Sequence, residues 1–162
     1  VFIGREGSQK DIFQKEFNCK INVNSENGEV LVEEIEGYND FLLSNIINAI
    51  NYGHSPENSL LLVNESYVFD IIDVKNLVKN HDRLKIVMGR IIGKNGSTRK
   101  AIEQITKCHV AVKDTYVSVI GPFENTLLVH EALNMLISGA SHKSFYSYLE
   151  KNKINSNMGF YL

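Results

Sequence analysis

The chain repeats itself at a spacing of 89 residues, and this duplication constrains its fold more than any other feature. At that spacing, IGREGSQKDIFQKEFNCKINV (3–23) aligns with IGKNGSTRKAIEQITKCHVAV (92–112). Two glycines, a serine, a cysteine and an alternation of apolar residues coincide in one register. Self-similarity at a fixed period indicates copies of one supersecondary unit. We therefore predict a tandem duplication within the 162 residues.

Each copy carries the same order of secondary-structure signals. After the glycine pair, apolar residues at helical spacing predict a short helix over 8–17 and over 97–106, with Ser8 and Ser97 as N-caps. Alternating patterns predict a hairpin in each copy, with strands at 20–24 and 29–35, then at 109–113 and 116–120. A longer amphipathic helix closes each copy, from Tyr38 to Ile50 and from Phe123 to Leu136.

The remaining segments complete a predicted α+β fold of order βααββα in each copy. Residues 84–88 are expected to form the opening strand of the second copy. The first copy begins at Val1, almost on its glycines, so we expect it to lack this strand and to be N-terminally truncated. The predicted domains are 1–52, a helical connector at 53–80, a second domain at 81–140, and a C-terminal helix and tail at 141–162.

Charge divides the chain into two unlike halves. Residues 1–80 hold 6 Lys and Arg against 13 Asp and Glu, and residues 81–162 hold 11 against 6. The second half is therefore the one suited to an acidic partner. No apolar run approaches the ~20 residues of a membrane helix, and we expect a cytoplasmic protein. Cys19 and Cys108 have no metal-binding spacing, so we predict two buried small residues and neither a metal site nor a cofactor.

The stretch GRIIGKNGSTRK (89–100) indicates contact with phosphate groups. It fails the nucleotide-binding P-loop pattern, because three residues rather than four separate Gly89 from Gly93, and Asn95 stands where a hydroxyl is required. A GxxG turn between two helices instead lets backbone amides approach successive sugar-phosphates. Such a loop can clamp a single strand.

The predicted clamp of the second copy has a polar loop and an apolar wall. The candidate RNA-binding residues are Gly93, Lys94, Asn95 and Gly96, supported by Arg90, Ile92, Arg99 and Lys100. Ile102, Val110 and Val112 are expected to continue the wall that holds unstacked bases. The alternative, a tight helix–helix turn without a ligand, is less consistent with the repeated motif and its basic surroundings.

The first copy is the weaker candidate. Its loop reads GREG, and Glu6 and Asp11 would repel phosphate. A weak RNA contact through Gly4, Arg5, Gly7 and Lys10 and a structural or protein-contacting role remain equally open.

Other groups of polar residues favour structural roles. The five histidines are dispersed along the chain, which favours solvated or capping positions over metal ligation. We predict a solvated strand edge, rather than paired catalytic carboxylates, for Glu33, Glu34 and Glu36. The aromatic residues of 145–148 are expected to pack a C-terminal helix, with base stacking as the lesser alternative.

The βααββα order with IGxxG resembles the KH domain of type I, whose GxxG loop clamps four nucleotides of single-stranded RNA or DNA. RLKIVMGRIIGKNGSTRKAIEQIT, followed by DTYVSVIG and SGASHKSFYSYLE, is similar to the two-KH small-subunit ribosome assembly factor of archaea and eukaryotes. The connector GHSPENSLLLVNESYVFDIIDV is similar to the linker of that family, and a GxxG in the first copy favours the archaeal type.

The resemblance implies a non-enzymatic RNA-binding protein of rRNA processing that acts near the 3′ end of small-subunit rRNA. It also implies two protein partners, the Nob endonuclease and the alpha subunit of translation initiation factor two, and a nucleolar as well as cytoplasmic location if the chain is eukaryotic. The alternative function is a protein-interaction scaffold that uses acidic residues 26–73, with incidental RNA contact.

Overall fold

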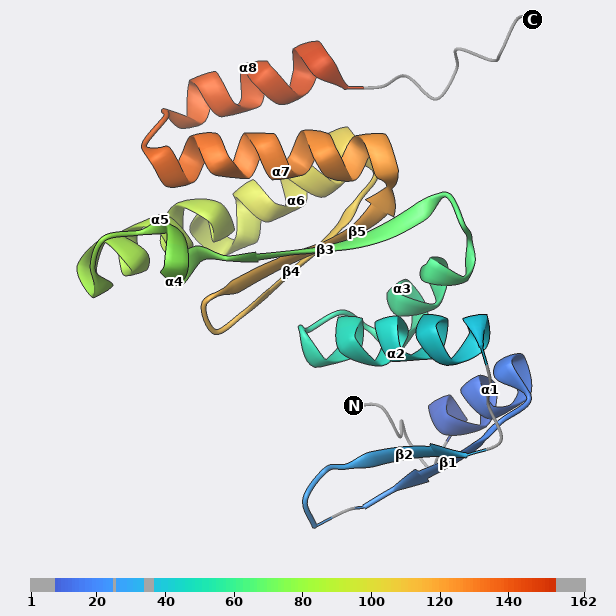
Figure 1. The fold of residues 1–162 in the computed structure, drawn as a ribbon. Coiled ribbons are helices and arrows are strands. Elements are labelled where there is room, and N and C mark those ends of the chain that lie inside the picture. The colour runs from blue at the N-terminus through green and yellow to red at the C-terminus, as the bar shows by residue number, and fades with distance from the viewer. Residues whose placement is uncertain (1–7, 25, 34–36, 154–162) are drawn as a thin grey trace, which may run out of the picture.

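A computed structural model describes residues 8–24, 26–33 and 37–153 (Figure 1). The elements are α1 (Ser8–Phe17), β1 (Lys20–Val23), β2 (Val30–Glu33), α2 (Tyr38–Asn51), α3 (Pro56–Leu60), η2 (Leu61–Val63), β3 (Tyr67–Asp73), α4 (Val74–Leu77), α5 (His81–Ile92), η3 (Lys94–Gly96), α6 (Ser97–Thr106), β4 (His109–Lys113), β5 (Tyr116–Pro122), α7 (Phe123–Ser138) and α8 (His142–Asn152). This order confirms the mixed α+β class.

The two sequence copies correspond in the structure at the level of single positions. The helices α1 and α6 occupy equivalent residues, and each is followed by an antiparallel hairpin, β1–β2 and β4–β5. Phe13 and its counterpart Ile102 are both fully buried. An apolar side chain at this point anchors the helix to the core in both copies, which explains why the repeat preserves it.

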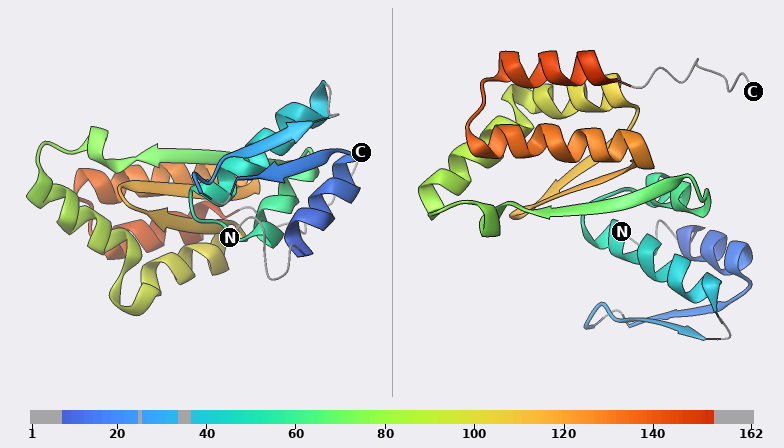
Figure 2. Two further views of the ribbon diagram at one scale, coloured as in Figure 1. Left: turned by 90° about the horizontal axis from the view of Figure 1, so that it is seen from below. Right: turned by 45° about the horizontal axis from the view of Figure 1, so that its top comes forward.

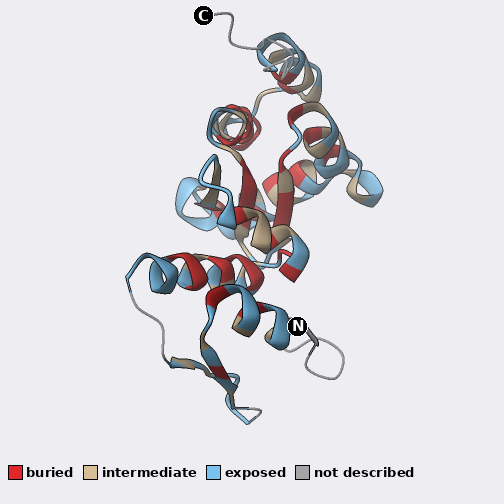
Figure 3. Ribbon diagram, turned by 90° about the vertical axis from the view of Figure 1, so that its right-hand side faces the viewer, coloured by how far each residue is buried: buried red, intermediate tan, exposed pale blue. Residues whose placement is uncertain are grey.

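A three-stranded antiparallel sheet of order β3–β5–β4 separates two hydrophobic cores. The helices of the second copy cover one face, and α1, α2 and the β1–β2 hairpin lie on the other side (Figures 1 and 2). Side chains alternate between the faces of a strand. In β5, Val117 and Val119 accordingly join the core under α7, whereas Ile120 joins the core of the first copy. Figure 3 shows the resulting run of buried positions on both layers.

Two predictions about the approach to the second glycine loop are wrong. Residues 84–88 form part of helix α5 rather than a strand, because Leu84, Val87 and Ile91 are the buried positions and follow a helical period. The opening strand is instead β3, within the segment predicted as a helical connector. Only α3, η2 and α4 of that segment are helical. β3 is stabilised by pairing with β5 from Tyr67↔Pro122 to Asp73↔Tyr116, a contact that no local pattern reveals.

The C-terminal helix forms as predicted and packs against α7. Phe145 and Leu149 are fully buried there, so the packing interpretation of these aromatic residues is confirmed for Phe145. Within the described ranges, no helix is both long enough and apolar enough to cross a bilayer.

Candidate nucleic-acid interface

The GKNG loop joins α5 to α6 through backbone conformations that favour glycine. Gly93 has φ 74° and ψ 169°, and Gly96 is left-handed with φ 75°. A Cβ on Gly93 would lie 2.4 Å from Thr98 Oγ1 and 2.6 Å from the Thr98 backbone nitrogen. Gly93 is therefore required by both dihedral angles and space. Gly96 is required by its dihedral angle alone, because a Cβ there would meet nothing within 4 Å.

The two residues between the glycines face solvent. Lys94 and Asn95 are exposed, and neither side chain has a hydrogen bond or ion pair to another described residue. Asn95 is itself left-handed, with φ 52°, a conformation that asparagine adopts more readily than most residues. Both side chains are thus free to meet a ligand.

Helix α6 begins at this loop without a side-chain cap. Its N-cap is Gly96, and Ser97, predicted as the cap, is already helical with φ −61° and ψ −41°. The cap prediction for Ser97 is wrong, and the side chain of Ser8 lies outside the described part. Uncapped N–H groups and the positive end of the helix dipole favour an anion at this point.

The three cations predicted to support the loop differ in whether their charged groups already have partners in the protein. The Arg90 guanidinium donates to the backbone oxygens of Leu136, at 2.9 Å, and Ala140. It therefore stabilises the C-terminal end of α7 and is not a free phosphate ligand. Arg99 Nε lies 3.6 Å from Glu103 Oε1, and Lys100 is exposed with no ion-pair partner among the described residues.

Helices α7 and α8 brace the loop in a way that sequence reasoning missed. His142 Nε2 lies 3.0 Å from the backbone oxygen of Arg90, and the Tyr146 hydroxyl donates to Thr98 Oγ1 at 3.3 Å. Thr98 is buried directly beneath Gly93. The only sequence signal was the mixture of aromatic and basic residues in 141–153, which we assigned to packing.

A shallow cleft of about 480 Å³ lies between α6 and the start of β4. It is lined by Lys100, Glu103, Gln104, Lys107, Cys108 and His109. The expected apolar wall is only partly present, because Ile102 and Val110 are buried in the core. Ile92 is 37% exposed and Val112 is half-buried. The prediction that Ile102 and Val110 contact bases is wrong, since their side chains hold α6 and β4 together.

The free edge of β4 faces this cleft. The Val110 N–H donates to Glu103 Oε1 at 2.9 Å rather than to β5. Backbone groups alternate in direction along an antiparallel edge strand, so those of Val112 also point away from β5. They are available for hydrogen bonds to an extended ligand.

The first-copy candidates Gly4, Arg5 and Gly7 lie outside the described residues. Lys10 is half-buried on α1. Within the described ranges, no three His, Cys, Asp or Glu side chains come together as a metal site. Cys108 is buried as predicted, and burial raises the pKa of its thiol, but Cys19 is only half-buried.

Two histidines depart from the solvated or capping positions that we predicted. His54 is 3% exposed, and its Nε2 lies 3.1 Å from Ser118 Oγ at the junction of the two cores. Burial, together with the nearby charge of His109, lowers its pKa to about 4. His130 Nδ1 lies 2.6 Å from Asp70 Oδ2 and joins α7 to β3. Both histidines have structural roles.

A family model for the second KH domain of PNO1 proteins, described as a eukaryotic type KH-domain (KH-domain type I), matches residues 68–154. The match begins within β3 and continues just beyond α8.

Curated relatives carry names consistent with this match. A KH domain-containing protein of Methanocaldococcus jannaschii is 32% identical over 94% of this chain and 69% of its own length. The RNA-binding protein PNO1 of Oryzias latipes is 32% identical over 64% of this chain and 43% of its own length. The pre-rRNA-processing protein PNO1 of Debaryomyces hansenii is 31% identical over 65% and 42%. The chain thus spans less than half of these two eukaryotic relatives.

Solved structures resemble nearly the whole chain. Dim2p of Pyrococcus horikoshii has a TM-score of 0.82 at 34% identity, over 93% of this chain and 91% of the other. A complex of a/eIF2alpha, aDim2p and rRNA from the same organism includes a chain with a TM-score of 0.83 at 34% identity, over 93% and 85%.

Proposed function

The chain belongs to the PNO1 type of KH-domain proteins, and we propose that it is a non-enzymatic single-stranded RNA-binding protein that acts on small-subunit rRNA near its 3′ end during ribosome assembly. Its relatives are named RNA-binding or pre-rRNA-processing proteins. The solved complex contains aDim2p with rRNA. These names indicate RNA as the class of ligand, and we propose the GKNG loop as the place where it binds.

The observation that carries the proposal is the open loop at the start of α6. Lys94 and Asn95 are exposed and unpaired among the described residues, Gly93 and Gly96 keep the backbone uncovered, and the first turn of α6 has no side-chain cap. A sugar-phosphate chain satisfies all three features at once, because it offers anionic oxygens to the amides, the ammonium group and the amide side chain.

The surface on both sides of the loop supports an extended ligand. Gly89 lies on the exposed face of α5 one turn before Gly93, and nothing comes within 4 Å of the place where its Cβ would be. A helical glycine disfavours folding by about 1 kcal/mol relative to alanine, so a close approach from outside explains it better than the fold does. Ile92 and Lys100 then flank the bound RNA strand. Arg90 acts as a positioning residue, because it holds α5 against the end of α7.

We place this activity in a protein of two tandem type I KH domains. Their shared elements are α1, β1, β2 and α2 in the first and α6, β4, β5 and α7 in the second. The second domain in this proposal begins with β3 rather than at residue 81, since β3 completes its sheet. The first domain contributes a weaker RNA contact through Lys10 and the GREG loop.

The same reasoning extends to partners and location. We propose contact with the alpha subunit of initiation factor two, because the solved aDim2p complex includes a/eIF2alpha. Contact with the Nob endonuclease and a cytoplasmic location follow from the family resemblance.

The test is a double variant, Lys94→Asp with Asn95→Asp, titrated with a single-stranded oligonucleotide of the small-subunit rRNA 3′ end. Removal of the ammonium group and repulsion from two carboxylates should lower affinity about 30-fold or more at low salt. Aspartate tolerates the left-handed backbone of Asn95, so the fold should persist. The slope of affinity against salt should also fall by about 1 as one phosphate contact is lost.

The chain offers a matched control in its first copy. Lys15→Asp with Asn18→Asp makes the same two changes on an exposed lysine and an exposed left-handed asparagine, with φ 47° at Asn18. This control should change affinity less than about 3-fold, as expected for charges remote from the ligand. Equal affinity of the test and control variants would contradict RNA binding at GKNG. No oligonucleotide binding by the wild type would favour the protein-interaction scaffold instead.

A further inference from the structure

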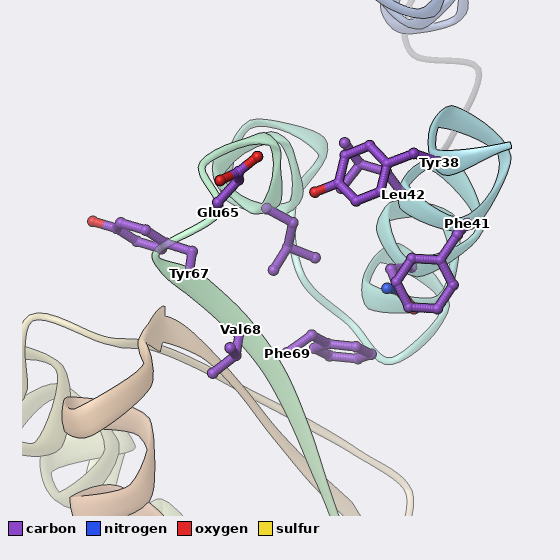
Figure 4. A pocket seen from close by; sticks show the side chains of 9 residues that line it. Tyr38, Phe41, Leu42, Glu65, Tyr67, Val68 and Phe69 are labelled. Atoms are coloured by element: carbon purple, nitrogen blue, oxygen red, sulfur yellow. The ribbon is translucent and has the colours of Figure 1, made fainter.

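A second cleft, of about 470 Å³, lies on the side of the sheet opposite to α7. Tyr38 and Phe41 from the first turn of α2 line one side, and Tyr67 and Phe69 from β3 line the other. Leu62 and Glu65 contribute to its wall from the segment between them. Figure 4 shows Phe69 extending from β3 toward Phe41 and α2.

The rings in this cleft are unusually open to solvent for aromatic side chains. Tyr38 is 60% exposed and Phe41 is 64% exposed. Neither the Tyr38 hydroxyl nor the Glu65 carboxylate has a hydrogen-bond partner among the described residues. Single exposed apolar residues are ordinary, but a hollow walled by several of them together with an unpaired carboxylate is typical of an interaction site.

The charge around the cleft determines what can enter it. Glu65 is the one charged residue in its lining, and the stretch of sequence that supplies the whole lining, 21–74, contains ten Asp and Glu and no Lys or Arg. Asp40 lies beside Phe41, and His54 is uncharged near neutral pH because burial lowers its pKa to about 4. Of the acidic side chains described on β3, only Asp70 pairs with a basic side chain, the imidazole of His130. A phosphate chain would be repelled here, and a cationic side chain would be attracted.

We propose that this cleft binds an arginine-bearing segment of a partner protein. The guanidinium group stacks on aromatic faces and pairs with a carboxylate, and the cleft presents both through Tyr38, Phe41 and Glu65. An aliphatic residue beside the arginine packs against Val68, which lines the cleft and is half-buried. The cleft thereby gives the acidic first half of the chain a binding function separate from the GKNG loop.

The probe is a synthetic peptide, LRLRL, compared with the same peptide in which citrulline replaces both arginines. Citrulline keeps the planar shape and removes the charge. Titrated into the ¹⁵N-labelled chain, the arginine peptide should shift the backbone amide signals of Tyr67 and Phe69. Its affinity should exceed that of the citrulline peptide at least about 5-fold, as expected for a cation between aromatic rings and a carboxylate.

Two exposed positions provide variants that leave the core intact. Glu65→Gln and Phe41→Ser should each weaken the arginine peptide at least about 5-fold, by loss of the ion pair and of ring stacking. Their controls are Glu26→Gln and Leu31→Ser, which make the same kinds of change on the exposed hairpin of the first copy. The controls should leave the affinity unchanged.

Three results would overturn the proposal. Equal affinity for the citrulline peptide would show that the cleft binds apolar groups and does not recognise the arginine charge. Competition by the peptide INSNMGFYL at the same signals would assign the cleft to residues 154–162 of this chain. Shifts of Tyr67 and Phe69 by the rRNA oligonucleotide would make it an RNA surface. The Lys94→Asp, Asn95→Asp variant should bind the arginine peptide normally, so the two proposals can fail separately.

Discussion

The first helices of the two copies, α1 and α6, are joined to the strands that follow them by equivalent hydrogen bonds. In the first copy the Ile21 N–H donates to Gln14 Oε1 at 2.9 Å. In the second copy the Val110 N–H donates to Glu103 Oε1, also at 2.9 Å. The residue directly after each helix has a left-handed backbone, with φ 47° at Asn18 and 58° at Lys107. The two copies therefore share the backbone contacts that fix each helix against its strand.

The side chains on the exposed face have diverged. Arg99 and Lys100 at the start of α6 correspond to Lys10 and Asp11 in α1. Two adjacent cations in one copy are thus a cation and an anion in the other. The scaffold of this unit is therefore separable from the charge it presents, so each copy can take a different partner.

The copies also differ in how they complete a core. Among the described residues, the first copy has the two-stranded sheet β1–β2, whereas β3 adds a third strand to the hairpin of the second. Ile120 of β5 belongs to the core of the first copy. The first copy therefore buries its apolar face partly against the sheet of the second.

The first substitution tests whether the conformation of the second loop requires glycine at position 93. Gly93→Ala should lower the free energy of unfolding by about 3–5 kcal/mol, because the Cβ overlaps Thr98 and the backbone lies in a region almost restricted to glycine. Urea denaturation gives the stability, and the rRNA oligonucleotide titration gives the accompanying loss of binding.

Two other glycines separate the overlap from the dihedral angle. Gly96→Ala and, in the first-copy hairpin, Gly28→Ala place a Cβ in open space at φ 75°. Each should cost only about 1–2 kcal/mol. If Gly93→Ala lowered the free energy of unfolding no more than Gly28→Ala does, the loop would tolerate a side chain at position 93. The overlap with Thr98 would then not explain why glycine is found there.

A somewhat smaller effect concerns His54, which lies where the copies meet. Its pKa is lowered from 6.5 in the unfolded chain to about 4 in the folded one, so the unfolded state binds more protons between these values. Stability should therefore be fully present above pH 6.5 and should decline as the pH falls toward 4, by up to about 3 kcal/mol from this group. Urea midpoints measured from pH 7 to pH 4.5 give the slope.

His54→Gln removes the titrating group and leaves an amide able to reach Ser118. It should flatten the part of the decline between pH 6.5 and 4.5. His81→Gln, at an exposed histidine, serves as the control and should keep the full slope. A decline that is the same in both variants would show that the junction of the copies does not depend on an uncharged His54.

The repeat made much of this fold predictable from the sequence. Helices α1 and α6, both hairpins, and the closing helices α2 and α7 lie within a few residues of their predicted bounds, because apolar periodicity and turn residues are local signals. The opening strand was misplaced because alternation in Leu84, Ile86 and Met88 is also compatible with a helix. Ile86 is 56% exposed in α5, and only the long-range pairing of β3 with β5 decides the matter.

The glycine loop of the candidate site was predictable, and its surroundings were not. Spacing identified Gly93 to Gly96, and the structure places Lys94 and Asn95 in solvent as expected. The hydrogen bonds of Arg90 to carbonyl groups at the end of α7 were not predictable, because they join residues far apart in the sequence. His54 and the aromatic cleft were missed for the same reason, since tertiary contacts between the copies create both.

The last substitution exchanges the acceptor side chain of the shared hydrogen bond, which is glutamate in the second copy and glutamine in the first. Glu103→Gln should keep the bond to Val110, because Gln14 makes its counterpart in the first copy. It also removes the partner of Arg99 and a carboxylate from the cleft beside Lys100. We therefore expect affinity for the rRNA oligonucleotide to rise about 3-fold, with stability unchanged within about 0.5 kcal/mol.

The reciprocal change, Gln14→Glu, places a carboxylate at the equivalent point of the first copy and should leave the oligonucleotide affinity of the second unaltered. Titration of both variants at low salt, where phosphate contacts weigh most, gives the clearest separation. A loss of affinity in Glu103→Gln would mean that Glu103 contacts the RNA directly, for example as an acceptor for a base amino group. The carboxylate would then be a specificity device of the second copy rather than a remnant of the shared scaffold, because glutamine keeps one acceptor oxygen for the Val110 N–H and replaces the other with an NH₂ donor.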